Sequence, residues 1–322
     1  MRAKIMILSG NDQAKRLAFS VQGVLSDLAI AFGHSFLMKE EKISTASVAE
    51  YGSAMTQEAI DEAKQCDAVL CLTDDGQGVI ELAAGIGSIV CGHVYQLPEM
   101  LAQHSLLKSG TLPHGLIAWP LSTQPNTLTD AAVLVYGLSK AQLVPIREIP
   151  LTGKRSRDWM AATGSVAAQN GQTQPHLSDV NHVLEGLLTV PEEMGIVFAT
   201  PSAASSVHAV ASSLSGLSPF LFDAYWDKQR AIAHAVQIDQ NAAADMTNPF
   251  GTLFAVAHML KHTLRLTREA DCLLTSIHNV LEAGWRTPDM PVDNAALHIG
   301  TEAICGLISQ QIELAGALVN LS

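Results

Sequence analysis

The sequence predicts an α/β protein with two domains. Residues 4–8 form a short apolar run, the turn GND follows at 10–12, and apolar residues then recur at helical spacing from about 14 to 32. The same features return further on, where helical spacing at 56–63 precedes a second apolar run at 68–72. Strands that alternate with helices pack as layers of helices over a sheet. At 322 residues, the chain also exceeds what one hydrophobic core usually fills.

The composition is that of a compact, acidic protein. Hydrophobic residues make up 48% of the chain and charged residues 16%, which suits a folded core and argues against disorder. The net charge of −12 would repel a phosphate backbone, and no basic stretch is larger than KRSR at 154–157. We therefore expect no nucleic acid as a partner.

No segment predicts export or a membrane span. The apolar run at the start is too short for the core of a signal peptide. The stretch at 78–101 is interrupted by Glu81, His93 and Glu99 before it reaches the roughly 20 apolar residues that a bilayer requires. The five cysteines are odd in number and lack CxxC spacing, as is usual for reduced thiols. We expect a cytoplasmic protein without membrane contact.

The middle and the end of the chain differ in their periodicity. The middle contains proline-rich turns and a short β-like run at 195–199, which predict a separate and less regular domain. At the end, Asn248 and Pro249 suit the start of a helix as N-cap and first-turn proline. A second helix begins at Thr267 and stops near Gly284, and a third covers about 301–318.

These closing helices carry motifs in a specific order. They read NPFGTLFAVAHML at 248–260, AD at 270–271, VLEAGWRTPD at 280–289 and GTEA at 300–303. This series resembles the closing pattern of the isopropylmalate and isocitrate dehydrogenase family in order and in spacing. Weaker likenesses lie upstream, in CDAVLCL at 66–72, IRE at 146–148, VN at 180–181 and IVFATPS at 196–202.

The resemblance implies a three-layer α/β fold with a mixed sheet and two domains. The first domain would combine residues 1–100 with 248–322, and the second, which carries the dimer contact, would cover 101–247. Members of the family form homodimers. They use NAD(P) and Mg²⁺ or Mn²⁺ to oxidise a 2-hydroxy acid and then release carbon dioxide.

That reaction requires three arginines for the substrate carboxylates and several carboxylates for the metal. The resemblance assigns Arg147 to the third arginine, whereas the other two fall near Leu107 and Ile117, with Lys108 adjacent to the first. The first metal aspartate aligns with Asn181, and Asp179 lies two residues away as the candidate metal ligand. Arg147 and Asn181 are the candidate substrate-binding residues. The other two metal positions fall at about Ser206 and Val210, so both lack a carboxylate.

Most of the residues with which the family transfers protons and binds the nucleotide are also missing from this sequence. Between 157 and 179 the chain is shorter than in the family and contains neither the lysine nor the tyrosine that move protons. The cofactor loop is replaced by AIAHAVQIDQN at 231–241, which retains only His234, displaced. His234 and Asn248 are therefore the candidate cofactor-binding residues.

Several residues allow a structural explanation beside a functional one. Arg147 either binds an anion or forms an ion pair with the neighbouring Glu148. His258 and His262 have a spacing that a metal site accepts, but they lack the glutamate of a zinc protease motif. Ser205, Ser206 and His208 suggest a nucleophile site, but they lack a GxSxG motif, and small residues that fill vacated space explain them more simply.

Three hypotheses follow for function. The leading hypothesis is a catalytically degenerate family member, a homodimer that binds a small carboxylate or acts as a non-catalytic partner. The second is an active dehydrogenase that uses NAD(P), Mg²⁺ or Mn²⁺ and a rebuilt site of Asp179, Asn181, His182 and Arg147. The third is a regulatory subunit of an active family member.

Overall fold

The computed structural model describes residues 1–95, 115–150, 156–169, 176–215, 220–238, 245–290 and 297–319. Contacts divide the chain into two compact units, which we describe separately. The terminal unit combines Met1–Gly87 with Arg230–Ser322, and the central unit is Ser88–Gln229. Both divisions come earlier in the chain than the expected positions at 100 and 247, because β4 (Val90–Tyr95) pairs only within the central unit and β10 (Ala231–Gln237) pairs with β3 of the terminal unit.

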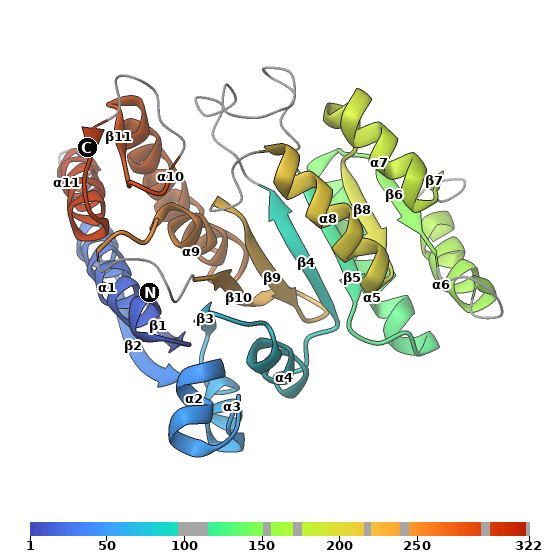
Figure 1. Cartoon of the computed structure of the whole chain (residues 1–322), viewed down its shortest axis with the longest axis horizontal. Helices are drawn as coiled ribbons and strands as arrows, with labels where there is room; N and C mark the ends of the chain where they lie inside the picture. The colour runs from blue at the N-terminus through green and yellow to red at the C-terminus, as the bar shows by residue number, and fades with distance from the viewer. Residues whose placement is uncertain are drawn as a thin grey trace. The chain divides into compact units, whose positions relative to one another are not determined.

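The sheet of the terminal unit is parallel. Its strands run in the order β2 (Ser35–Lys42), β1 (Arg2–Ser9), β3 (Ala68–Thr73) and β10 (Figure 1). Parallel strands that are covered on both faces have continuous apolar sequences. The residues Ile5, Met6, Ile7 and Leu8 of β1 are accordingly all fully buried.

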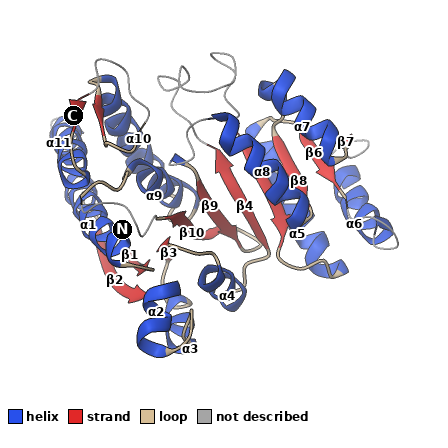
Figure 2. Cartoon of the chain, in the orientation of Figure 1, coloured by secondary structure: helices blue, strands red, loops and turns tan. Residues whose placement is uncertain are grey.

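Helices cover both faces of this sheet, as the connections require. The chain steps from β1 to β2 in one direction and from β2 to β3 in the other, so right-handed crossovers place the intervening helices on opposite faces. One layer consists, in packing order, of α1 (Asp12–Phe32), α11 (Thr301–Val319), α10 (Thr267–Glu282) and α9 (Phe250–His262). The other helices are α2 (Ser44–Tyr51), α3 (Gln57–Ala63) and α4 (Gln77–Gly85) (Figure 2).

Local signals in the sequence set the ends of several helices. Asn11 accepts a hydrogen bond from the Ala14 N–H at 2.8 Å and starts α1, and Gly33, with φ of 68°, ends it. Asn248 accepts from the Phe250 N–H at 2.8 Å, and α9 begins at Phe250 with Pro249 as its N-cap, one residue later than the sequence predicted. Gly284 follows α10 with φ of 88°, which only glycine adopts without strain.

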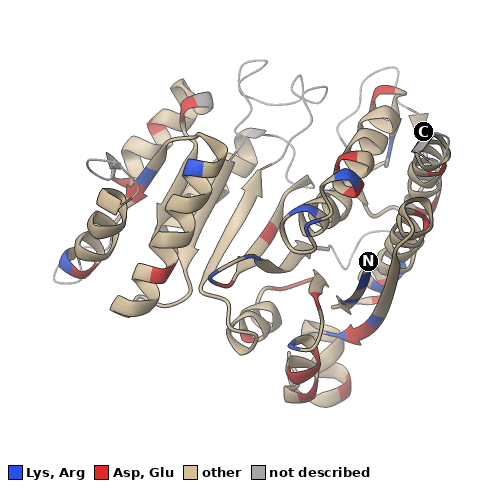
Figure 3. Ribbon diagram, turned by 180° about the vertical axis from the view of Figure 1, so that it is seen from behind, with Lys and Arg blue, Asp and Glu red and all other residues tan. Residues whose placement is uncertain are grey.

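Charged residues protect the edge strand β2. Lys39 pairs with Glu62, and Lys42 pairs with Glu50. Acidic and basic segments meet at the end of β2 and on the helices beside it (Figure 3). Charges on an edge strand discourage pairing with a strand of another chain.

The central unit contains a mixed sheet. Its strands run in the order β9 (Phe222–Trp226), β4, β5 (Gly115–Pro120), β8 (Ile196–Ala199), β6 (Ile146–Ile149) and β7 (His176–Leu177). β4 is antiparallel to both β9 and β5, and the other pairs are parallel. The short elements outside this sheet are a 3₁₀ turn at Pro191–Glu193 and, in the terminal unit, the β11 (Trp285–Arg286) and β12 (Leu297–His298) pair.

Helices also form two layers around the central sheet. α5 (Pro125–Gln142) packs with α6 (Ser156–Gln169), and α7 (Val180–Thr189) packs with α8 (Pro201–Ser215) on the other face (Figure 1). The three-layer α/β fold with a mixed sheet is therefore confirmed. The expectation of a less regular middle is wrong for the described residues, because its short strands and small-residue helices have weak periodicity in sequence but regular pairing in space. Within the described ranges, no helix has both the length and the apolar character that crossing a membrane requires.

A buried carboxyl group lies in the interior of the central unit. Glu148 on β6 is fully buried and accepts hydrogen bonds from the Tyr136 hydroxyl on α5 and from Trp159 Nε1 on α6, the latter at 2.9 Å. Burial raises the pKa of Glu148 above its ordinary value of 4.5, and the hydrogen bonds from these neighbours oppose the rise. An acid whose pKa is higher in the folded state binds its proton more tightly there, so its contribution to stability is present at low pH and is lost as pH rises.

We predict that Glu148→Gln changes this pH dependence. The glutamine has nearly the same shape but cannot ionise, so the stability of the wild type relative to the variant should decrease as pH rises from about 4.5, the ordinary pKa. Urea unfolding at several pH values measures it. The exposed Glu185→Gln on α7 is the control. Equal pH profiles for wild type and Glu148→Gln would contradict the assignment.

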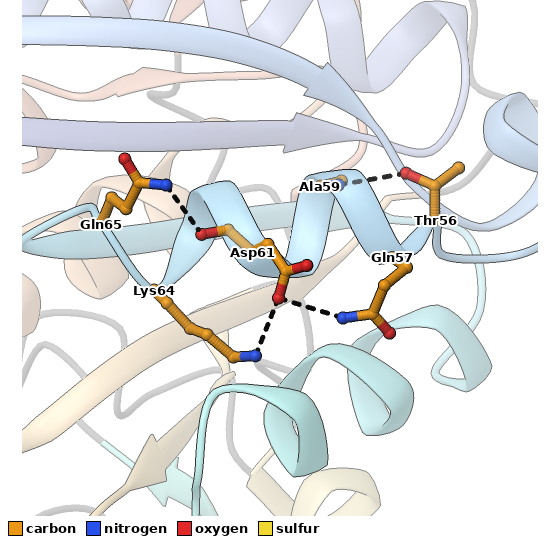
Figure 4. Close-up of polar contacts among 6 residues, drawn as sticks. All are labelled: Thr56, Gln57, Ala59, Asp61, Lys64 and Gln65. Carbon is orange, nitrogen blue, oxygen red and sulfur yellow. Dashed lines mark hydrogen bonds and ion pairs between the residues drawn. The ribbon is translucent and has the colours of Figure 1, made fainter.

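The short helix α3 depends on side-chain hydrogen bonds at its ends. Thr56 caps it by accepting from the Ala59 N–H at 3.2 Å (Figure 4). Asp61 accepts from Gln57 Nε2 at 3.0 Å and from Lys64 Nζ at 2.9 Å. A helix of seven residues has few internal hydrogen bonds, so its caps contribute a large share of its stability.

We expect Thr56→Ala to lower the free energy of unfolding by about 1 kcal/mol, the usual effect of removing an N-cap. Chemical denaturation measures this loss. Thr129→Ala is the matched control, since the Thr129 hydroxyl bonds to the Pro125 carbonyl within α5 and caps no amide. A loss in the control as large as that in Thr56→Ala would show that capping is not the cause.

Candidate functional site

A cluster of polar side chains lies on one part of the central sheet. Antiparallel pairing places His93 of β4 directly opposite Asp223 of β9. Tyr95, two residues further along β4, lies on the same face of the strand as His93. His208 reaches this face from α8, and Trp119 reaches it from β5. We refer to His93 and His208 as the stacked histidine pair.

The stacked histidine pair is held by specific contacts. The two rings lie 3.6 Å apart between centroids, with an angle of 24° between their planes. His93 Nδ1 lies 2.5 Å from Asp223 Oδ1, and the Tyr95 hydroxyl lies 2.6 Å from His208 Nδ1. The Trp119 ring packs against His93 at 4.7 Å. Each histidine therefore has one ring nitrogen engaged by a neighbour.

The surroundings keep His208 uncharged at neutral pH. Burial and then the neighbouring His93 lower the pKa of His208 to about 4, although Asp223 opposes the change. Burial and then Asp223 raise the pKa of Tyr95, so its hydroxyl stays protonated. The cluster thus contains a neutral imidazole beside an Asp–His pair.

A second histidine cluster lies inside the terminal unit. The histidine trio consists of His234 on β10 and of His258 and His262 on α9. His234 Nε2 lies 2.8 Å from His258 Nδ1, and the rings of His258 and His262 are 4.3 Å apart. Burial lowers the pKa of His234 to about 3 and that of His262 to about 4. A hydrogen bond between two neutral imidazoles requires one donor and one acceptor, which these lowered pKa values permit.

Neither cluster has the arrangement of a metal centre. Among the described residues, no group of three or more His, Cys, Asp or Glu side chains is placed to hold a metal ion. The i, i+4 spacing of His258 and His262, which a metal site accepts, belongs here to the buried trio.

The fold and this geometry allow comparison with known proteins. The sequence model of the family described as isocitrate/isopropylmalate dehydrogenase matches residues 235–308. The chain is 23% identical over 347 residues to 3-isopropylmalate dehydrogenase of Rhodopirellula baltica, with 94% of this chain and 97% of that protein covered. These comparisons support the resemblance of the chain to the isocitrate/isopropylmalate dehydrogenase family.

Solved structures of this group have the same fold. The apo form of a beta-decarboxylating dehydrogenase from Thermococcus kodakarensis superimposes with a TM-score of 0.77 at 14% identity, over 99% of both chains. Isocitrate dehydrogenase from Methylococcus capsulatus gives a TM-score of 0.76 at 11% identity, over 97% of this chain and 99% of that one.

Helix α8 is where the resemblance to the family places two metal carboxylates. Ser206 is exposed there, and its hydroxyl donates to the Ser202 carbonyl at 3.1 Å, while Val210 is half-buried. His208, between them, turns to the sheet and stacks on His93. Of the two remaining arginine positions, Ile117 is buried in β5, and Leu107 with Lys108 lies outside the described residues.

Arg147 is the predicted arginine of the family site. It lies on β6, and its Nη2 donates to the Glu193 carbonyl at 3.3 Å. The alternative ion pair with Glu148 is wrong, because neighbouring residues of a strand point to opposite faces and Glu148 bonds to Tyr136 and Trp159. Arg147 Nε is buried without a hydrogen-bond partner in the described part of the chain.

Asp179 and Asn181 lie together at the start of α7. Asp179 Oδ1 accepts from the His182 N–H at 2.9 Å and is the N-cap of this helix, and Asn181 is exposed in its first turn. The Ser178 N–H bonds to the Glu148 carbonyl at 2.8 Å, which connects this segment to β6. No ion pair joins Asp179 to Arg147 among the described side chains. The metal and substrate roles of these residues stay predictions.

The candidate cofactor-binding residues lie in the terminal unit. His234 is in a strand, with 0% of its surface exposed, so contact with a nucleotide would require its ring to leave the trio. Asn248 is 7% exposed, and its Nδ2 has no hydrogen-bond partner within the described ranges. Their roles in nucleotide binding also stay predictions.

The sequence did not point to His93, Tyr95 and Asp223. His93 was recognised only as a polar break in an apolar stretch, and Asp223 lies more than a hundred residues away in a segment without a motif. Their proximity depends on antiparallel pairing of β4 with β9, which the sequence does not specify.

We predict that the protein loses stability as pH falls below neutral. A histidine whose pKa is lowered in the folded state binds more protons when unfolded, so stability decreases from pH 6.5 towards about 4 as the unfolded chain protonates. His262→Gln should reduce the steepness of this loss. Chemical unfolding at pH 7.5, 6 and 5 is the measurement, with the exposed His298→Gln as control. The same steepness in His262→Gln as in wild type would refute the contribution of this residue.

Proposed function

We propose that this protein has kept the family fold but has lost metal-dependent oxidative decarboxylation, and that it binds small carboxylates in the cytoplasm as a homodimer. The observation that carries the proposal is the composition of α8. Its 15 residues, PSAASSVHAVASSLS, contain neither aspartate nor glutamate. The helix that the resemblance assigns to two metal carboxylates therefore offers none.

The chemistry explains why this matters. Mg²⁺ and Mn²⁺ bind oxygen anions, and hydroxyl or apolar side chains at the same positions replace neither the charge nor the ligand number. The metal would hold the substrate hydroxyl and stabilise charge on the oxygen that forms, an effect of several kcal/mol in metalloenzymes. The lysine and tyrosine that would move protons are also missing between 157 and 179.

Arg147 supports retained binding of a small carboxylate. A guanidinium group presents several N–H donors in a plane that matches a carboxylate. One Nη2 hydrogen bond to a carbonyl leaves donors for a ligand, and the buried Nε has no protein partner in the described residues. The rebuilt dehydrogenase site is less well supported, because Asp179 Oδ1 already caps α7.

Thermal melting tests the proposal, because a ligand of the native state raises the melting temperature. We expect a rise with malate, tartrate, isocitrate or isopropylmalate alone, and no further rise with Mn²⁺ and NAD or NADP. A ligand at 100 times its Kd stabilises by about 2.7 kcal/mol, which melting detects easily. Arg147→Gln should remove the rise, and the exposed Arg157→Gln on α6 should keep it.

Joint stabilisation by Mn²⁺ and a nucleotide, or reduction of NAD or NADP with any of these acids, would overturn the proposal in favour of an active dehydrogenase. Co-purification with an active family member would point to a regulatory subunit.

A further inference from the structure

The stacked histidine pair has complementary ring nitrogens. The Asp223 carboxylate only accepts hydrogen bonds, so the nitrogen of His93 that faces it, Nδ1, carries the proton. In the neutral ring, Nε2 of His93 then has a lone pair, to which no described residue donates a hydrogen bond. The carboxylate fixes this tautomer and the orientation of the ring, as the acid of a catalytic triad does. His93 is therefore arranged as a base.

His208 has the opposite tautomer. The Tyr95 hydroxyl has a single proton and lies 2.6 Å from His208 Nδ1, against 3.5 Å from the His208 carbonyl. The shorter contact takes the proton, so Nδ1 accepts and Nε2 carries hydrogen. Because the ring remains neutral, Nε2–H is a hydrogen-bond donor that does not itself release a proton. A neutral histidine of lowered pKa polarises carbonyl groups in this way in known enzymes.

The cluster is partly exposed to solvent. The side chain of His93 is 14% exposed and that of Asp223 is 33% exposed, so solvent reaches the site. Stacking at 3.6 Å holds the two rings beside each other, and Trp119 supports the other side of His93. The groups around the pair are Asp223 from β9, Tyr95 from β4 and Trp119 from β5. Among the described residues that contact the pair, Asp223 carries the only formal charge, and this carboxylate favours an uncharged ligand over an anion.

We propose that the stacked histidine pair catalyses proton transfer at the carbon next to the carbonyl group of a small uncharged ketone, without metal or nucleotide. His93 Nε2 removes the proton, and the electron pair of the broken C–H bond forms the C=C bond of an enolate. The charge that moves to the carbonyl oxygen is stabilised by the hydrogen bond from His208 Nε2–H. Return of a proton from His93 to carbon restores the ketone. The cycle consumes nothing and exchanges the carbon-bound hydrogen with solvent.

His93 and His208 are the catalytic residues of this reaction, and Asp223 and Tyr95 are positioning residues. The activity is separate from carboxylate binding at Arg147 and from the lost decarboxylation. It requires only an acceptor and a donor close together, a combination that general acid–base catalysis uses.

Deuterium exchange tests the proposal directly. Protein in D₂O with EDTA and without nucleotide is mixed with hydroxyacetone, and the loss of its carbon-bound hydrogens is followed by proton NMR. We expect exchange above the buffer rate, and a decrease of at least about 100-fold in His93→Gln and in His208→Gln. His298→Gln is the control for the substitution type. Pyruvate, which has the same carbonyl chemistry and a negative charge, should exchange more slowly.

A second measurement does not depend on variants. Nitrogen-15 NMR of histidine-labelled wild type assigns the tautomers: His93 should carry its proton on Nδ1 and His208 on Nε2. Asp223→Asn should shift His93 to the other tautomer and move the pH profile of exchange, whereas a merely structural residue would leave that profile in place. Tyr95→Phe removes the hydroxyl that fixes Nδ1 of His208 as an acceptor, so His208 should no longer be restricted to the tautomer with hydrogen on Nε2.

Exchange no faster than buffer, exchange only with pyruvate, loss of exchange with EDTA, or the same tautomer in both histidines would each overturn the proposal. Melting curves for every variant show whether it is folded, and a folded His93→Gln that retains full exchange would also overturn it.

Discussion

In each unit, helices cover the strands of the large sheet on two faces, and this burial is the constraint on which the other features depend. A strand segment buried on both faces is apolar throughout, as residues 5–8 of β1 and 68–72 of β3 are. The covering helices need one apolar side each, which gives the sequence its periodicity. A polar group in such an interior must find a partner or lose the free energy of its hydration, about 1–3 kcal/mol for a neutral group.

The ionisable groups of the interior show how this requirement is met. Glu148 is buried with Tyr136 and Trp159 as donors, and His234 is buried with His258 as partner. Burial raises the pKa of the acid and lowers the pKa values of the bases, so in each case the neutral form is favoured. The same physics at the partly exposed cluster keeps His208 neutral while Asp223 orients His93. Structural and reactive clusters thus differ in exposure and in partner chemistry, and not in the kind of residue.

The family fold does not require the family chemistry. α8 packs on the central sheet through its buried alanines and valine, and those contacts are independent of the residues at the positions assigned to the metal. Serine or valine at the positions that the resemblance assigns to metal carboxylates is therefore compatible with this architecture. His208 lies on the inner side of this helix. Its contact with His93 depends on where the helix is placed over the strand. The same architecture therefore allows different side chains at these positions.

The sequence by itself determined the local structure and the family. Apolar runs and helical spacing predicted β1, α1, β3 and the closing helices, because these signals depend on neighbouring residues and on residues at helix ends such as Pro249 and Gly284. The closing motifs were enough to recognise the family. The tertiary structure decided which polar residues meet. Cross-strand pairing placed His93 next to Asp223. The alternation of side chains along β6 placed Arg147 and Glu148 on opposite faces, and the Asp179 carboxylate accepts a hydrogen bond as the N-cap of α7. These contacts join residues far apart in the chain or depend on which face a side chain occupies, and the local sequence specifies neither.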